Sequence, residues 1–174
     1  MSKRIANRSF FTVPAEELAP KLLGKILCHE VGEGKDIFVI KTRITVTEVY
    51  PSNDKFTDAN RSNSPNAQSM VGGHIHYFYN TAEGRKRLDI VAGKEGVPES
   101  VLIAETDMYD GPQKTLWALD VNDAKYDGID LTSPDSKIWL EDDGTIVTPN
   151  LPTCRKNLAD DKPLRFSVKS LTFK

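Results

Sequence analysis

Apolar positions recur with a helical period near the N-terminus and with a strand period over most of the remaining chain. The apolar residues of 15–23 follow helical spacing, with Pro14 before them and Gly24 after them, so they predict a short amphipathic helix. Alternating segments rich in Ile, Val and Thr predict strands, at 25–31, 36–50, 74–79, 88–91, 101–105, 145–147 and 164–173. The glycine-rich stretch 32–35 is typical of a hairpin turn between the first two.

Helical signals are weaker in the second half of the chain. Apolar spacing predicts a short helix over 114–119, and a second short helix is expected after Asp127-Gly128. The stretch 51–69 is rich in Ser, Asn and Asp and predicts a long loop, which in a compact domain is usually functional or disordered. These elements predict the α+β class, with one domain over 1–174, a curved, mostly antiparallel sheet and several short helices.

Composition adds limits on the class of protein. The 174 residues fit one domain, and 39 % apolar with 28 % charged residues is close to globular values. No apolar run approaches the roughly 18 residues that cross a bilayer, and basic residues at the N-terminus precede no apolar stretch, so we expect no membrane segment, no secretion signal and an intracellular protein. A net charge of -2 argues against a protein that coats nucleic acid, although a local positive face is compatible with it.

Glu48 is the first candidate for chemistry. It interrupts an apolar and β-branched strand just before the long loop, and carboxylates in apolar settings at strand ends suit proton transfer. Tyr50 is two positions further along the strand, so the two side chains should share one face of the sheet. The competing interpretation of Glu48 is a solvent-facing strand residue, because Glu is rarely buried.

Three further patterns could carry function. His74-x-His76 could place two imidazoles on one strand face, but no third ligand is evident, so no metal is expected. The aromatic run 76–79 could pack in a core or stack on nucleobases. The basic cluster 85–87 could hold phosphate or form a solvated turn. A nucleophilic triad and a glycine-rich phosphate loop are not supported. The two cysteines, far apart in sequence, are expected to be buried or spare thiols.

Several segments, taken in chain order, resemble motifs of the alkyladenine (3-methyladenine) DNA glycosylases. The matches to the first motifs are residues 10–27 to "FF..P…LA..LLGK.L", 47–50 to "ETEAY", 70–73 to "MF..PG" and 97–104 to "AVLIRA". The later matches are residues 111–119 to "GPGKL..ALGI", 127–131 to "NG.DL" and 162–166 to "KPWRF". The resemblance therefore extends over nearly the whole chain.

The resemblance implies a base-excision-repair enzyme that works without a cofactor as a monomer. Its partner would be double-stranded DNA containing damaged bases, in the cytoplasm or nucleoid of a bacterium or the nucleus of a eukaryote. Such an enzyme extrudes a damaged purine nucleotide, because its sugar–base bond is out of reach inside a duplex, and hydrolyses that bond without a lyase step. The matched Glu48 would deprotonate the attacking water, and Tyr50 would stack on the extruded base.

Several other working positions of the family carry different residues here. The pocket histidine falls on Asp58 or Ala59, the arginine that helps hold the water falls on Ala104, and the pocket asparagine falls near Leu88 or Asp89. The tyrosine that fills the duplex falls near Thr81, or on Tyr79 if the local gap in the match lies elsewhere. The remaining residues expected near DNA are Tyr77, Tyr79, Arg43, Arg85, Lys86 and Arg87.

These departures leave three hypotheses. The first is a divergent monofunctional purine DNA glycosylase that uses Glu48. The second is a catalytically weak or inactive damage-recognition module on the same fold, because an unheld water loses much of its orientation. The third is a small-molecule hydrolase that reuses the Glu48 pocket.

Overall fold

The computed structural model describes residues 1–57, 70–80, 85–97, 99–121 and 123–174. Within these ranges the helices are short: α1 (Ala15–Leu22) and α3 (Pro112–Ala118), with 3-10 turns at Arg8–Phe10 and Ala124–Tyr126. The strands are β1 (Lys3–Arg4), β2 (Ile26–Val31), β3 (Phe38–Tyr50), β4 (Ile75–Asn80), β5 (Arg85–Ala92), β6 (Glu99–Thr106), β7 (Ile138–Asp142), β8 (Ile146–Pro149) and β9 (Arg165–Thr172). The fold is α+β, as predicted.

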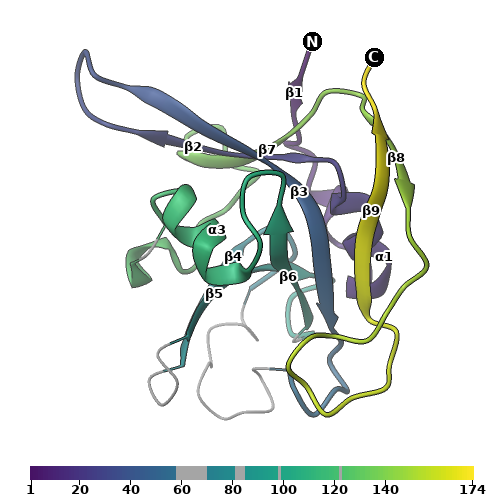
Figure 1. The fold of residues 1–174 in the computed structure, drawn as a ribbon. Helices are drawn as coiled ribbons and strands as arrows, with labels where there is room; N and C mark the ends of the chain where they lie inside the picture. Colours follow the sequence, from purple (N-terminus) through teal and green to yellow (C-terminus); the bar gives the residue numbers. More distant parts are fainter. Residues whose placement is uncertain (58–69, 81–84, 98, 122) are drawn as a thin grey trace.

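Within the described residues, nine strands form one curved sheet in which the strand pairs are antiparallel. The order is β1-β7-β2-β3-β6-β5-β4, and β9 joins β3 on the edge that β2 leaves, with β8 beside it. Figure 1 shows the β2–β3 hairpin extending from the body, while the far end of β3 reaches the opposite end of the molecule. The long strand β3 therefore links two distant regions.

The helix α1 covers one face of this sheet. Ala15, Leu18, Ala19 and Leu22 are buried on it, and their spacing is the helical period that the sequence predicted. They pack with core residues of the sheet such as Val49 and Ile103, and each fully buried Leu contributes about 1.5–3 kcal/mol. Gly24, with φ of +79°, follows the helix in the left-handed conformation that glycine adopts without strain.

The sequence prediction is wrong in the segment after Asp127-Gly128, where a helix was expected. The chain there forms turns and an isolated bridge beside the start of β4, where Gly128 N–H donates to Ile75 O and Ile75 N–H donates to Ile129 O, both at 2.8 Å. A backbone paired in this way cannot form the internal bonds of a helix. Strands β1 and β7 were not predicted. Of the loop expected at 51–69, residues 51–57 form turns and 58–69 lie outside the described residues.

Two sequence expectations about composition can be compared with the structure. Cys28 is buried and Cys154 is exposed, and both are free thiols, as expected. Burial is the main cause that raises the pKa of Cys28 to about 12. In the described parts of the chain, no helix has the length and apolar character needed to cross a membrane.

Candidate active site

The end of β3 lies between two packed layers. Thr47 and Val49 face α1, where the Thr47 hydroxyl donates to Ala19 O at 3.1 Å and Val49 joins the main core. Val46 and Tyr50 face the other side, in a small cluster with Leu102. Because strand side chains alternate and the register with β6 is regular from Thr47 onward, Glu48 shares the second face with Tyr50, as predicted. We call this second face the site face.

A row of residues crosses four strands on the site face. The register places Asp89 of β5 opposite Leu102 of β6, Leu102 opposite Glu48 of β3, and Glu48 opposite Arg165 of β9. Residues directly opposite in antiparallel strands point to the same face and lie in contact distance. Glu48 therefore sits in the middle of the sheet, with a guanidinium on one side and an apolar side chain on the other.

The hydrogen bonds that described residues make to the Glu48 side chain both reach one oxygen. Oε1 accepts from Arg165 Nη1 at 2.6 Å and from the backbone N–H of Lys156 at 3.0 Å. No donor from the described residues lies within hydrogen-bond distance of Oε2. Glu48 is only 3 % exposed, so the alternative of a solvent-facing strand glutamate is wrong. In the part of the chain that the structure describes, the carboxylate is therefore held at one oxygen.

The arginine partner of Glu48 also binds a second carboxylate. Arg165 Nη2 lies 2.5 Å from Glu105 Oε1, and Lys156 Nζ lies 3.1 Å from the same oxygen. A bulge explains how Glu105 reaches this position: Val46 pairs with Glu105 and Thr47 with Ile103, which leaves Ala104 as the extra residue of β6. Arg165 thus bridges two carboxylates, and its own side chain is 9 % exposed.

Tyr50 is a buried aromatic wall beside Glu48. The guanidinium carbon of Arg87 lies 4.3 Å from the ring centroid and that of Arg155 lies 4.9 Å away, both within the range of cation–π attraction. Burial is the main cause that raises the pKa of Tyr50 to about 12, so its hydroxyl keeps its proton at neutral pH. The ring is therefore a neutral surface with cationic neighbours.

Arg155 fixes the segment that follows β8 to the end of β3. It donates to Val49 O at 2.9 Å, to Asp54 Oδ2 at 2.8 Å and to Asp160, and its side chain is fully buried. Burial alone would raise the pKa of Asp54, but the Phe56 N–H and the Arg155 guanidinium lower it below its usual value. We call Arg155, Asp54 and Asp160 the clamp. It holds the backbone of Lys156 where Glu48 accepts its hydrogen bond.

A surface cleft of about 670 Å³ opens beside the clamp, lined by residues 53–56 and 159–162. Two of its lining residues, Asp54 and Asp160, belong to the clamp, whereas Glu48 and Tyr50 do not line it. The cleft therefore marks the border of the clamp and not the position of the Glu48 carboxylate.

The other predicted pocket residues are placed as follows. Asp89 is fully buried on the site face, where it accepts from Ser100 Oγ at 2.8 Å and from Arg87 Nη2 at 2.9 Å. Ala104 is 2 % exposed and packs in the small cluster with Tyr50. Asp58 and its alternative Ala59 lie outside the described residues. Asp89 and Ala104 thus lie on the same face as Glu48.

The residues expected near DNA are divided between two hairpins. Tyr77 and Tyr79 belong by their backbone to β4, and Arg85, Lys86 and Arg87 belong to β5, which pairs with it. The side chains of Tyr77, Tyr79 and Arg85, and the whole of Thr81, lie outside the described part. Lys86 is partly buried, and the guanidinium of Arg87 packs on the ring of Tyr50.

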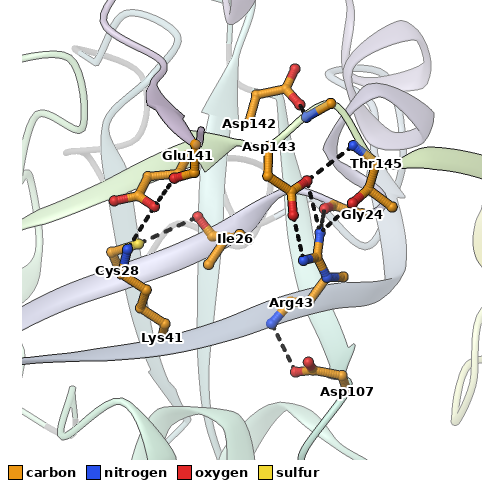
Figure 2. A network of polar contacts seen from close by, with 12 residues as sticks. Gly24, Ile26, Cys28, Lys41, Arg43, Asp107, Glu141, Asp142, Asp143 and Thr145 are labelled. Carbon is orange, nitrogen blue, oxygen red and sulfur yellow. Dashed lines mark hydrogen bonds and ion pairs between the residues drawn. The ribbon is translucent and has the colours of Figure 1, made fainter. Parts of the chain in front are cut away.

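Arg43 lies near the start of the projecting hairpin and is engaged in a structural network. Its guanidinium donates to Asp143 at 2.7 Å and to Gly24 O at 2.7 Å, while its backbone N–H donates to Asp107 at 2.8 Å. Figure 2 shows these contacts. The side chain is 12 % exposed. These contacts tie the turn after β7 to β3, and the structure does not bring Arg43 to the residues around Glu48.

The histidine pair has separate partners. His74 Nδ1 lies 2.8 Å from Val71 O, and His76 Nδ1 lies 3.2 Å from Asp127 Oδ1. Across the part of the chain that the structure describes, no three His, Cys, Asp or Glu side chains gather as a metal site would require.

Comparisons with known proteins bear on this arrangement. The family model of the methylpurine-DNA glycosylases matches residues 9–104, which is more than half of the chain and includes Glu48, Tyr50, Asp89 and Ala104. The chain belongs to the methylpurine-DNA glycosylase family. This is a family of DNA repair enzymes, and the membership favours a DNA substrate over the small molecule of the third hypothesis.

Relatives of this glycosylase family extend the likeness over most of the chain. A protein of Psychrobacter cryohalolentis named "Putative 3-methyladenine DNA glycosylase" is 30 % identical over 80 % of this chain and 78 % of its own length. A protein of the same name from Burkholderia orbicola is 27 % identical over 94 % of this chain and 87 % of its own length. Another, from Prosthecochloris aestuarii, is 37 % identical over 60 % of this chain and 50 % of its own length.

The sequence analysis did not identify three residues of the candidate site in this protein, namely Arg165, Glu105 and Arg155. Arg165 lay within the segment matched to "KPWRF", so a signal existed, but its role depended on the pairing of β9 with β3. Glu105 reaches Arg165 only because of the bulge at Ala104. Arg155 follows an irregular segment, and no periodicity marked it.

Proposed function

We propose that this protein is a monofunctional purine DNA glycosylase in which Glu48 activates the water that hydrolyses the N-glycosidic bond. The observation that carries the proposal is the buried Glu48 carboxylate, which has Oε1 bound by Arg165 and Lys156 and Oε2 without a described donor. A general base must be fixed in place and must still offer a lone pair to the water. Glu48 meets both conditions.

The reaction is a hydrolysis at the anomeric carbon of an extruded nucleotide. The water oxygen forms a bond to this carbon while the bond from the carbon to the base nitrogen breaks, and the bonding electrons leave with the base. Glu48 accepts the proton that the water loses. The buried carboxylate also stabilises the positive charge that develops on the sugar, an effect that is stronger away from bulk water.

Tyr50 is proposed to form one wall of the base pocket. An aromatic ring suits an extruded purine because stacking replaces part of the stacking lost in the duplex, whose cost is lowest at damaged base pairs. Asp89 and Ala104 would contribute to the same pocket, because both lie on the site face. Which lesion fits depends on this set of residues.

DNA contacts are proposed for the β4–β5 hairpin, since a double-stranded DNA substrate needs both a wedge and phosphate contacts. Tyr77 and Tyr79 would lie near the duplex, and Arg85 and Lys86 near phosphates. We propose that residues 1–174 act as one monomeric unit. Salt should weaken DNA binding, because phosphate contacts release counterions.

The test is an excision assay on a panel of duplexes that carry alkylpurines, hypoxanthine or etheno adducts. We expect the wild type to release at least one of these bases, and Glu48→Gln to lower the single-turnover rate on the order of 1,000-fold, as for loss of a general base. Arg4→Gln is the control, because Arg4 holds backbone carbonyls near β1 at the far side of the sheet. A wild type that frees no base, or equal rates for wild type and Glu48→Gln, would contradict the proposal.

A damage-recognition module is the second candidate, and Ala104 favours it. This position carries no arginine, so a water near Glu48 has one donor fewer than the family resemblance implies. Tight binding to one lesion of the panel without release of the base would support this candidate. Binding without any preference for damaged DNA would contradict both.

A further inference from the structure

Arg165 and Glu105 lie beside the proposed base without being part of the sequence-based site. We propose that Arg165 is a positioning residue that holds Glu48 in its working orientation, and that Glu105 sets the orientation of Arg165. The inference rests on the proposed function and names two residues that the reaction needs beyond Glu48.

The pairing of β9 with β3 supports the proposed role of Arg165. Arg165 lies directly opposite Glu48 across the β3–β9 pair, so its guanidinium reaches the carboxylate without leaving the site face. The contact of 2.6 Å is to Oε1, the same oxygen that the Lys156 N–H binds. Two donors on one oxygen fix the plane of the carboxylate and direct Oε2 away from both of them.

Ala104 explains why an arginine from β9 matters here. On β6, the neighbour of β3 on its other edge, Ala104 packs with Tyr50 in the small apolar cluster and offers no side-chain donor. The charged donor from a neighbouring strand that contacts Glu48 is therefore Arg165 on the opposite edge. The positive charge beside Glu48 therefore comes from an arginine on β9, whereas Ala104 on β6 supplies none.

The contacts of Glu105 support its proposed role in orienting Arg165. Its Oε1 lies 2.5 Å from Arg165 Nη2, and Lys156 Nζ lies 3.1 Å from the same oxygen. The guanidinium is planar and donates from two separate nitrogens, so a bond at each end fixes its rotation. A lysine at this position could carry the charge but could not bind both carboxylates in the same fixed geometry.

The pH dependence of excision should report these contacts. Among the described residues, the charged and titratable groups nearest Glu48 are Arg165 on β9, Glu105 on β6, Lys156 after β8 and Tyr50 on β3. Around Tyr50 follow Arg87, Asp89 and Arg155, which none of the variants changes. Removing Arg165 takes a positive charge from Glu48, so the acidic limb of the rate profile should move to higher pH. Removing the charge of Glu105 takes a negative charge from the same group, so that limb should move to lower pH.

The experiment measures single-turnover excision and lesion-DNA affinity of the full chain, on the duplex that the wild type cleaves fastest. We expect Arg165→Gln to lower the rate about 100-fold with less than about a threefold change in Kd, because a misplaced catalytic group costs rate and not binding. Arg165→Lys should recover part of the rate, and Glu105→Gln should lose on the order of 10-fold. Arg4→Gln and Glu30→Gln serve as an arginine and a glutamate control from other strands, because among the described residues Glu30 on β2 makes only a loose ion pair of 3.9 Å with the exposed Lys137.

Each outcome bears on a different claim. Unchanged rates in Arg165→Gln and Glu105→Gln, or acidic limbs that move in the same direction, would overturn the inference and leave the proposed function standing. A wild type that frees no base would overturn the proposed function and the inference together. If Arg165→Gln fails to fold by circular dichroism, the partly exposed Glu105 keeps the test decisive, because equal rates and equal pH profiles for Glu105→Gln and wild type would overturn the inference.

Discussion

Two positions on β3, Arg43 near its middle and Glu48 near its end, each carry one partner of an arginine–carboxylate pair, yet the two pairs differ in what surrounds them. Near the hairpin, Arg43 meets Asp143, and their side chains are 12 % and 23 % exposed. Near the end of β3, Arg165 meets Glu48, and their side chains are 9 % and 4 % exposed. Arg43 of the first pair also contacts a turn residue and a backbone carbonyl, whereas Arg165 of the buried pair also binds a second carboxylate, and Tyr50 lies on the same face of the sheet as Glu48. The Arg43–Asp143 pair therefore serves the structure of the hairpin, whereas the surroundings of the Arg165–Glu48 pair are those on which the proposed chemistry depends.

The clamp beside the buried pair should show the largest loss of stability. Arg155→Gln leaves Asp54 and Asp160 buried without their guanidinium, and breaking one side of a buried ion pair costs about 3 kcal/mol. We expect the urea midpoint to fall with an unchanged slope, and excision to fall with it, because the Lys156 N–H loses its fixed position.

Arg155→Lys is the matched variant of this measurement, since it keeps the charge and loses the forked geometry. It should be less destabilised than Arg155→Gln. Equal stability of wild type and Arg155→Gln would show that the clamp does not hold this end of β3.

At the hairpin end, the pH dependence of stability should come in part from Glu141. Burial alone would raise its pKa, but hydrogen bonds from Lys41, Ser2 and Trp139 lower it to about 2 from an ordinary 4.5. Because the folded state favours the ionised form, the contribution is fully present above about pH 4.5 and is lost as the pH falls toward 2. Figure 2 shows the Lys41 contact.

Glu141→Gln should therefore be less stable than wild type by about 2 kcal/mol at neutral pH, and this difference should shrink below pH 4.5. Urea titrations at a series of pH values measure it. A difference that stays constant down to pH 2 would argue that the carboxylate is not stabilised by these hydrogen bonds.

The smallest effect is expected for the pair that resembles the site most closely. Asp143→Asn removes the charge that Arg43 meets, but Arg43 keeps Gly24 O and Thr145 as acceptors, so the loss of stability should be about 0.5–1 kcal/mol. Thermal unfolding and the excision rate measure the two effects. A loss of excision as large as that of Arg165→Gln would remove the distinction between the Arg43–Asp143 pair and the Arg165–Glu48 pair.

The elements that could be predicted from sequence are those defined by local periodicity. The helix α1 and the long strand β3 show it over many residues, and the placement of Glu48 and Tyr50 on one face followed from β3 alone. The short strand β7 was missed because five residues give too little periodicity. The expected helix after Gly128 failed because pairing with Ile75 overrode local preference.

The site was only partly predictable, because its remaining members depend on pairing between distant strands. The contact of Arg165 with Glu48 needs the register of β9 against β3, and that of Glu105 needs the bulge at Ala104. The clamp depends on an arginine in an irregular segment that packs on the end of β3. No single strand or helix contains this information.

The row of residues across β5, β6, β3 and β9 has a consequence for the order of folding. Glu48 and Arg165 are 117 positions apart in the chain, and contacts between distant residues form slowly because closing long loops costs entropy. The α1 helix and the β2–β3 hairpin can form early from neighbouring residues. The proposed base Glu48 gains its arginine only when the last strand of the sheet docks, so during refolding, the proposed excision activity should return later than the bulk of the secondary structure.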